Sequence, residues 1–181
     1  MLFRSTSFQT ITARGYSGGL ASTTRGVFGG GSRSGAYTAN IEYCTIDTTG
    51  SVAGFGNLTI ARSLNHAGGA SSTRGLFICG YASTTATNRM DYITIASTGN
   101  ATTFGNLTGG VNSGSQTYNA VMSNSTLAVT AGGGGDGGAN IRMDYVTIAT
   151  TGNGTFWGNM QSRSGSQNYY HAGLSNCHGG I

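Results

Sequence analysis

The chain has 181 residues, of which 33 are glycine and none is proline, and 8% are charged with a formal net charge of +4. The low charge argues against a disordered chain. A collagen chain is also excluded, because collagen needs proline and a glycine at every third position and this chain has neither. There is no apolar stretch of about 18 residues, so we expect no membrane insertion. The apolar residues at the N-terminus stop at Phe3, so we expect no signal peptide.

The positive charge comes from arginines that are spread along the chain, with no two of them adjacent. Nucleic-acid-binding proteins usually gather their cations on one face, so we expect no nucleic-acid partner. The cysteines Cys44, Cys79 and Cys177 do not have metal-ligand spacing. They are typical of a protein made in a reducing cytoplasm without a disulfide framework.

The predicted elements, in chain order, are a part-unit, three repeats and a second part-unit within one domain, residues 1–181. The chain starts with a strand at 8–12 that matches the last strand of a repeat. The repeats then cover approximately 13–60, 61–108 and 109–160. The second part-unit, 161–181, contains a first strand at Tyr169–Ser175 and the beginning of a second strand at 177–181.

Three markers carry this repeat assignment. One is Arg25-Gly-Val-Phe, which returns as Arg74-Gly-Leu-Phe and is weaker in the last repeat, as Thr126-Leu-Ala-Val. The run Met90–Asn100, Met-Asp-Tyr-Ile-Thr-Ile-Ala-Ser-Thr-Gly-Asn, returns as Met143–Asn153 and, less closely, as Ile41–Gly50. The run Phe55-Gly-Asn-Leu-Thr returns at Phe104 and, as Trp-Gly-Asn-Met-Gln, at Trp157. Self-similarity in one register indicates a repeat architecture.

Each repeat has the signals of four short strands and almost no helix signals. In the second repeat these strands are predicted at His66–Ser72, Arg74–Tyr81, Met90–Ala96 and Thr103–Thr108, because β-branched and aromatic residues alternate with turn sequences. Four strands in about 50 residues make a β-propeller blade. We therefore predict an all-β propeller of about four blades, three complete and one split between the termini, or an open arc of such blades.

The repeat resembles the Kelch motif. In that family the first strand has an Arg and a His, the second ends in a Gly pair, the third has an aromatic residue and the fourth a Trp. The matching residues in this chain are Arg62, His66, Gly29-Gly30-Gly31, Tyr43, Tyr92, Tyr145, Phe55, Phe104 and Trp157. The second repeat departs from the motif, because it has Cys79-Gly80 instead of a Gly pair.

The run Met90–Thr108 and the arginine-flanked segment Ser72–Phe77 are also similar to repeats of virion structural and tail-associated proteins from phages of aquatic bacteria. This resemblance covers the chain from about Phe8 to Ile181. It implies a Kelch-like array and a non-enzymatic structural or attachment role in the tail, fibre or decoration of a phage virion. The protein would be made in the host cytoplasm, and its partners would be other virion proteins or copies of itself.

Charged residues at equivalent repeat positions are expected to be structural. Glu42, Asp91 and Asp144 each precede the repeat tyrosine and are predicted to accept hydrogen bonds at a strand start. Arg25 and Arg74 occupy equivalent positions, as do Arg14 and Arg62. They are predicted to bridge neighbouring blades through hydrogen bonds to carbonyls or to these acids, and an Arg–acid pair between blades is the favoured arrangement. The alternative is an arginine ring that faces a central funnel and holds an anionic sugar or a lipid headgroup.

We expect no catalytic site, metal or cofactor. His66, His171 and His178 do not share one repeat position, and a metal site needs three or more converging ligands. The alternative function is carbohydrate binding in host recognition, because exposed tyrosines would stack on the sugar rings of a host-surface glycan. The candidate ligand contacts are Tyr16, Tyr37, Tyr81, Tyr118 and Tyr170.

Overall fold

The computed structural model describes residues 11–48, 52–64, 68–83, 85–109, 119–135, 138–139, 141–161 and 175–176. Within these ranges the regular elements are strands and no helix occurs, so the predicted all-β class is confirmed. No helix in this part of the chain therefore has the length and apolar character needed to cross a membrane.

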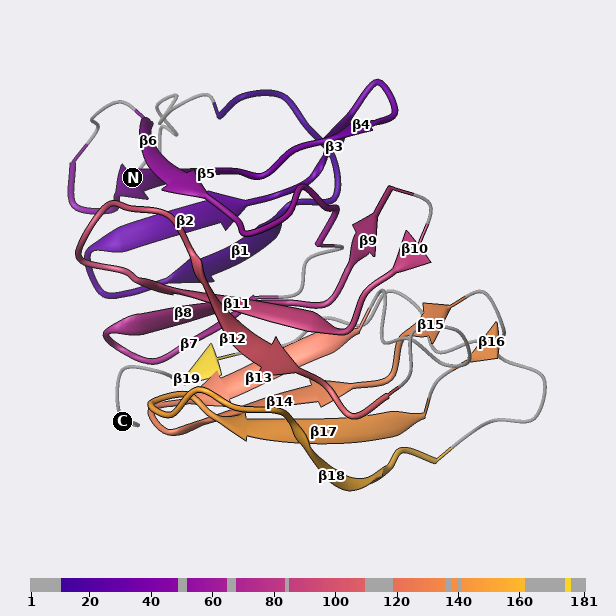
Figure 1. The fold of residues 1–181 in the computed structure, drawn as a ribbon. Helices are drawn as coiled ribbons and strands as arrows, with labels where there is room; N and C mark the ends of the chain where they lie inside the picture. The colour runs from indigo at the N-terminus through magenta and orange to yellow at the C-terminus, as the bar shows by residue number, and fades with distance from the viewer. Residues whose placement is uncertain are drawn as a thin grey trace, which may run out of the picture.

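Each repeat forms its own antiparallel sheet, whose four long strands pair in chain order (Figure 1). Sheet I consists of β1 (Gly18–Ala21), β2 (Arg25–Gly29), β5 (Asn40–Thr45) and β6 (Ala53–Asn57). Sheet II consists of β7 (Gly68–Ala70), β8 (Arg74–Ile78), β11 (Arg89–Thr94) and β12 (Thr102–Asn106). Sheet III consists of β13 (Ala120–Asn124), β14 (Leu127–Ala131), β17 (Arg142–Thr147) and β18 (Thr155–Asn159), with β19 (Ser175–Asn176) added in parallel to β13.

A small hairpin interrupts each sheet between its second and third strands, and all three hairpins lie on the same side of the molecule (Figure 1). The hairpins are β3 (Ser32–Arg33) with β4 (Ala36–Tyr37), β9 (Tyr81–Ala82) with β10 (Thr85–Ala86), and β15 (Gly134–Gly135) with β16 (Gly138–Ala139). The last of them lies in the most glycine-dense segment of the chain.

The four strands predicted for the second repeat are present as β7, β8, β11 and β12. All four end before their predicted ends, and β11 and β12 begin one residue before their predicted starts. The predicted first part-unit, 8–12, is described only at Ile11 and Thr12, which lie outside any strand. The predicted strand Tyr169–Ser175 is described only at Ser175, which begins β19.

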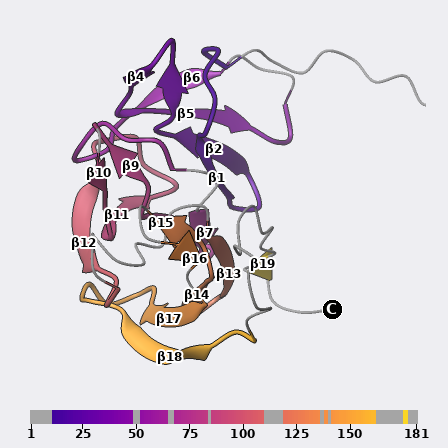
Figure 2. The same cartoon turned by 90° about the vertical axis from the view of Figure 1, so that its right-hand side faces the viewer.

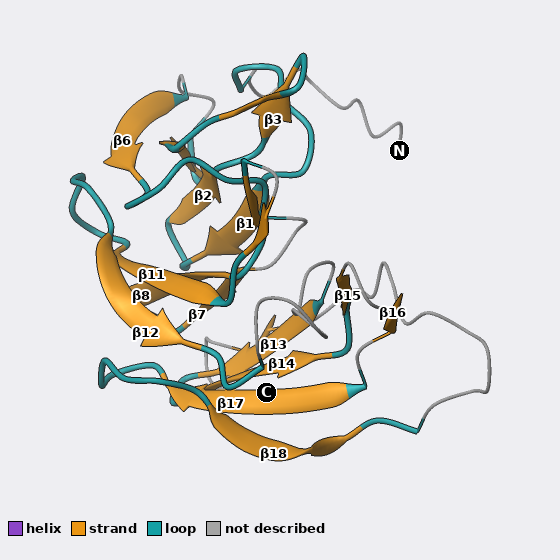
Figure 3. Cartoon of the chain, turned by 45° about the vertical axis from the view of Figure 1, so that its right-hand side comes forward, coloured by secondary structure: helices purple, strands orange, loops and turns teal. Residues whose placement is uncertain are grey.

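The first strands of the sheets lie side by side on the inner side of the molecule, and β6, β12 and β18 lie on the outer side (Figure 2). Small residues allow this approach, because a Cβ on Gly68 would overlap the carbonyl oxygen of Gly19. The strand β19 pairs in parallel with β13 at the inner edge of sheet III, where Ser175 lies opposite Ser123. Figure 3 shows the three sheets following one another in this order.

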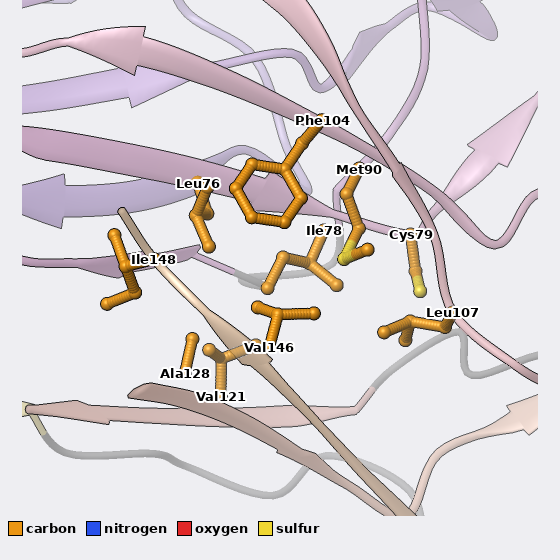
Figure 4. Packing of buried hydrophobic residues seen from close by; sticks show 10 residues of the cluster. All are labelled: Leu76, Ile78, Cys79, Met90, Phe104, Leu107, Val121, Ala128, Val146 and Ile148. Atoms are coloured by element: carbon orange, nitrogen blue, oxygen red, sulfur yellow. The ribbon is translucent and has the colours of Figure 1, made fainter. Parts of the chain in front are cut away.

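Two apolar clusters fill the spaces between successive sheets. Between sheets I and II, Val27, Ile41 and Phe55 pack with Phe77 and Ile93. Between sheets II and III, residues of β8, β11 and β12 pack with residues of β13, β14 and β17 (Figure 4). Both faces of sheet II are therefore buried, which explains the scarcity of charged side chains.

The departure from the Gly pair in the second repeat leaves the backbone path unchanged. Gly30, Cys79 and Gly132 follow the second strands and have φ of +62°, +58° and +68°. This left-handed conformation costs a residue with a Cβ about 1 kcal/mol. The Cys79 side chain is fully buried in the apolar cluster between sheets II and III, so its packing offsets the cost.

Candidate functional site: the contact between successive sheets

Each repeat acid lies next to an irregularity in its sheet. In sheet II, Met90 pairs with Gly105 whereas Asp91 pairs with Thr103, so Phe104 is an extra residue on the outer strand. The same register shift precedes Glu42 in sheet I and Asp144 in sheet III. Such bulges re-aim side chains, and here they accompany an acid and an aromatic residue in every repeat.

The acid of each sheet accepts hydrogen bonds from a threonine that precedes that sheet in the chain. Thr59 follows the last strand of sheet I, and its Oγ1 donates to Asp91 at 2.6 Å while its N–H donates to the same carboxylate at 3.2 Å. Thr108 makes the same pair of bonds to Asp144 at 2.8 and 3.0 Å. Thr12 makes them to Glu42 at 2.6 and 3.3 Å.

Arginines complete the surroundings of these acids. Arg62 and Asp91 form an ion pair of 2.7 Å in which both side chains are fully buried. Arg62 also donates to the carbonyl oxygens of Cys79 and Phe77 at 3.0 and 3.3 Å. Burial lowers the pKa of Arg62 from its ordinary value, and the Asp91 carboxylate opposes this change. The equivalent Arg14 lies 2.9 Å from Glu42.

Two further arginines form ion pairs with the second and third acids. Arg89 lies 3.3 Å from Asp91, and Arg142 lies 2.9 Å from Asp144. Both side chains are partly exposed, whereas the two carboxylates are fully buried. The acids of sheets II and III are thus held by cations as well as by hydroxyl groups.

Arg25 and Arg74 bridge successive sheets through carbonyls. The favoured Arg–acid pair is formed by Arg14 and Arg62 instead. Arg25 donates to the Ile95 carbonyl beyond the third strand of sheet II at 2.9 Å, and Arg74 donates to the Ile148 carbonyl of the third repeat at 2.9 Å. Each guanidinium also lies 4.5 Å from the centre of the tyrosine ring of its own sheet. These contacts with the next repeat and with the rings occupy both guanidinium groups.

The turn after the third strand of one sheet forms hydrogen bonds with the outer strand of the preceding sheet. The N–H groups of Gly99 and Ala101 donate to the carbonyls of Phe55 and Asn57, both at 2.8 Å. The Asn57 N–H donates to the Asn100 side chain at 3.0 Å. A side chain at Gly56 would overlap the Gly99 carbonyl, so the close approach requires glycine there.

The same contact recurs between sheets II and III. The N–H groups of Gly152 and Gly154 donate to the carbonyls of Phe104 and Asn106 at 2.9 and 2.8 Å. The Asn106 N–H donates to the Asn153 side chain at 3.0 Å. The recurring Thr-Gly-Asn sequences are therefore sheet-to-sheet contacts as well as turns.

The aromatic pair of each repeat has the same geometry but not the same exposure. The rings of Tyr43 and Phe55, of Tyr92 and Phe104, and of Tyr145 and Trp157 meet edge to face at 5.9–6.1 Å. Phe55 and Phe104 are 4% and 3% exposed, whereas Trp157 is 58% exposed. Trp157 borders a groove of about 360 Å³ on sheet III.

The candidate ligand tyrosines are dispersed along the chain. Tyr16 is exposed in the loop before β1, and Tyr37 and Tyr81 are half-buried in two of the small hairpins. Tyr118 and Tyr170 lie outside the described residues. Two polar pockets of about 250 Å³ each occupy equivalent places beside the turns of sheets II and III.

Several candidate residues for metal or thiol chemistry lie outside the described residues, namely His66, His171, His178 and Cys177. Among the described residues, no three His, Cys, Asp or Glu side chains are grouped so that they could hold a metal ion. Cys44 and Cys79 are buried free thiols. Burial raises the pKa of the Cys79 thiol far above its ordinary value, which keeps this thiol protonated and unreactive.

Sequence reasoning identified the repeat positions but missed several residues that join the sheets. The missed residues are Thr12, Thr59, Thr108, Asn57, Asn100, Asn106 and Asn153. The recurrence of Leu-Thr after Phe-Gly-Asn, and of Asn after Thr-Gly, is the signal for them.

No family model matches the chain. No curated protein matches it either.

Proposed function

We propose that the chain is a non-enzymatic structural or attachment protein of a phage particle, built as a Kelch-like propeller array and acting through protein–protein contacts. The observation that carries this proposal is that the repeated polar side chains contact the neighbouring segment or sheet. The three acids, the arginines Arg14, Arg25, Arg62 and Arg74, and the asparagines of the turns all join one segment or sheet to the next. These polar residues therefore recur in every repeat because each of them holds neighbouring units of the array together.

The propeller arrangement is supported by the order of the inner strands. The strands β1, β7 and β13 follow one another, and β19 occupies the next place. Thr12 holds Glu42 as Thr59 and Thr108 hold the acids of sheets II and III, so a segment with the role of a sheet-to-sheet link precedes sheet I. Both observations agree with a fourth unit between sheets III and I.

The virion role rests on the resemblance of the repeat to phage structural proteins, and it has a direct test. Particles are purified from cells that carry the gene, and their proteins are identified and counted by mass spectrometry. The chain is expected at a fixed number of copies per particle. Its presence in the lysate together with its absence from pure particles would refute the role.

Carbohydrate binding is the second candidate function, and the two equivalent polar pockets favour it. Both are lined by threonine hydroxyls, a turn asparagine and aromatic rings, and neither is lined by a charged residue. Neutral hydroxyl and amide groups beside an aromatic ring are suited to a sugar. A glycan array probed with the full chain tests this function, with Thr98→Ala and Tyr16→Ala separating the pocket from the exposed tyrosine.

A further inference from the structure

In the part of the chain that the structure describes, no segment covers the outward face of sheet III as sheet II covers sheet I and sheet III covers sheet II. Phe55 and Phe104 are buried beneath the following sheet, whereas the equivalent Trp157 is 58% exposed. Met90 is fully buried, and its equivalent Met143 is only partly buried. An aromatic residue that is buried in two repeats and exposed in the third marks a surface suited to contact with another protein.

This face forms an apolar groove of about 360 Å³. Its lining residues are Met122, Ser123, Asn124, Leu127, Val129, Met143 and Trp157. Leu127 occupies the place of Arg25 and Arg74, as the strand pairing shows. The groove is therefore lined without a charged side chain, and its occupant must be apolar on the side that enters it.

The edge of the groove is the outer strand β18. In sheets I and II the equivalent strand holds the next sheet through a carbonyl of its aromatic residue and the backbone of its asparagine. The corresponding groups in sheet III belong to Trp157 and Asn159. Gly158 is also open, because a Cβ there would only touch the Met143 side chain at 3.7 Å.

The strand β19 pairs with the inner edge of sheet III at β13. Within the described residues, the uncovered face runs from β13, which contributes Met122 to the groove, across β14 and β17 to β18. In sheet I the corresponding part is covered by Ile93 and Ile95, from the third strand of sheet II and the residue that follows it, and by the turn at Gly99 and Asn100. The natural occupant of the free part is therefore a third strand, its turn and a fourth strand.

We propose that the groove on sheet III is a docking site for a β-hairpin of this same repeat type, presented by a partner protein and carrying a Gly-Asn turn. This inference rests on the proposed role in protein–protein contacts. The glycine N–H of the turn donates to the Trp157 carbonyl, and the asparagine side chain accepts from the Asn159 N–H. Two isoleucines on one side of the hairpin fill the groove beside Trp157.

A peptide of residues 89–106 is the probe for this site. Arg89 and Asn106 are paired at the ends of the hairpin, so a cysteine added at each end closes the peptide by a disulfide bond. Trp157 is the only tryptophan of the chain, and the peptide has none. On binding to the full chain, the peptide should move the emission of Trp157 to shorter wavelength and lower its acrylamide quenching several-fold.

Two matched changes test the geometry. Gly158→Ala on the chain should weaken peptide binding by about tenfold or more, because the added Cβ points at the place of the turn, as at Gly56 and Gly105. It should leave the unfolding midpoint of the chain unchanged. Asn100→Ala in the peptide removes the hydrogen-bond acceptor and should also weaken binding.

Each outcome decides the proposal. An unchanged Trp157 signal, or equal binding by the changed and unchanged partners, overturns it. The proposal is also overturned if light scattering gives the mass of a monomer and Trp157 of that monomer is already shielded from acrylamide, because the chain then covers its own groove. An oligomer that the peptide dissociates supports it, with a second copy as the partner. The particle analysis described above is independent of these results and tests the virion role separately.

Discussion

The guanidinium of Arg62 donates to the carboxylate of Asp91 at 2.7 Å, with both side chains fully buried. Arg62 belongs to the segment that leaves sheet I, and Asp91 lies in the third strand of sheet II. The pair therefore fixes the order of two sheets at a place that water does not reach. Such a pair depends on both of its members, because removal of one leaves a buried charge without compensation.

Asp91→Asn should lower the free energy of unfolding by about 3–5 kcal/mol, the usual cost of breaking a buried ion pair. The asparagine leaves the Arg62 charge buried without its counter-charge. Urea unfolding at neutral pH measures the change. The control is Asp47→Asn at an exposed position, expected to alter stability by less than about 0.5 kcal/mol. A loss below about 1 kcal/mol at Asp91 would contradict the structural role of the pair.

Gly56→Ala should destabilise the chain by about 1–3 kcal/mol or more, the usual cost of overpacking. The new methyl group would overlap the carbonyl oxygen of Gly99 and separate sheet I from the turn of sheet II. Gly54→Ala, two residues earlier on the same strand, is the matched control, because no atom lies within 4 Å of its Cβ. Thermal unfolding of both variants tests the contact, and equal midpoints would show that the turn does not approach so closely.

Arg74→Met should cost about 1.5–3 kcal/mol, because it removes charge-assisted hydrogen bonds to carbonyls of the third repeat and the contact with the Tyr92 ring. Methionine keeps much of the apolar stem, so the change isolates the guanidinium. Arg33→Met serves as the control at an exposed position in the first hairpin. Chemical unfolding gives both values, and similar losses at the two positions would refute the bridging role of Arg74.

The Cys79 thiol should make stability depend on pH in the alkaline range. Burial raises its pKa in the folded state above the ordinary value of 9.0. Below about pH 9 the thiol is protonated in both the folded and the unfolded state, and stability does not depend on its titration. Above about pH 9 only the unfolded state loses the proton, which stabilises the unfolded state. The free energy of unfolding should then fall by up to about 1.4 kcal/mol per pH unit.

Cys79→Ala should remove this part of the pH dependence. The measurement is urea unfolding of the chain and of the variant between pH 8 and pH 10, with Cys44→Ala as the matched control. The stability difference between the chain and Cys79→Ala should shrink as the pH rises. A constant difference would show that folding does not raise the pKa of this thiol.

The strands inside each repeat were predictable because their signals are local. Tyr-Ile-Thr-Ile and its relatives alternate along a strand, and the Thr-Gly sequences that follow end it. The second repeat shows this best, since all four of its strands occur where they are predicted. The exact strand ends were not predictable, because they depend on the bulge beside Asp91 and on pairing with neighbouring strands.

The sequence by itself determined the all-β class, the number of complete repeats and the equivalence of Glu42, Asp91 and Asp144. These follow from periodic residue types, which are properties of short segments. Only the tertiary structure decided which groups join the sheets, because Thr59 and Asp91, or Asn106 and Asn153, are far apart in the chain. It also decided that Trp157, equivalent to two buried phenylalanines, is exposed. Burial depends on what packs against a residue, and equivalent positions in a repeat can have different neighbours, so the repeat pattern alone does not predict which of them is exposed.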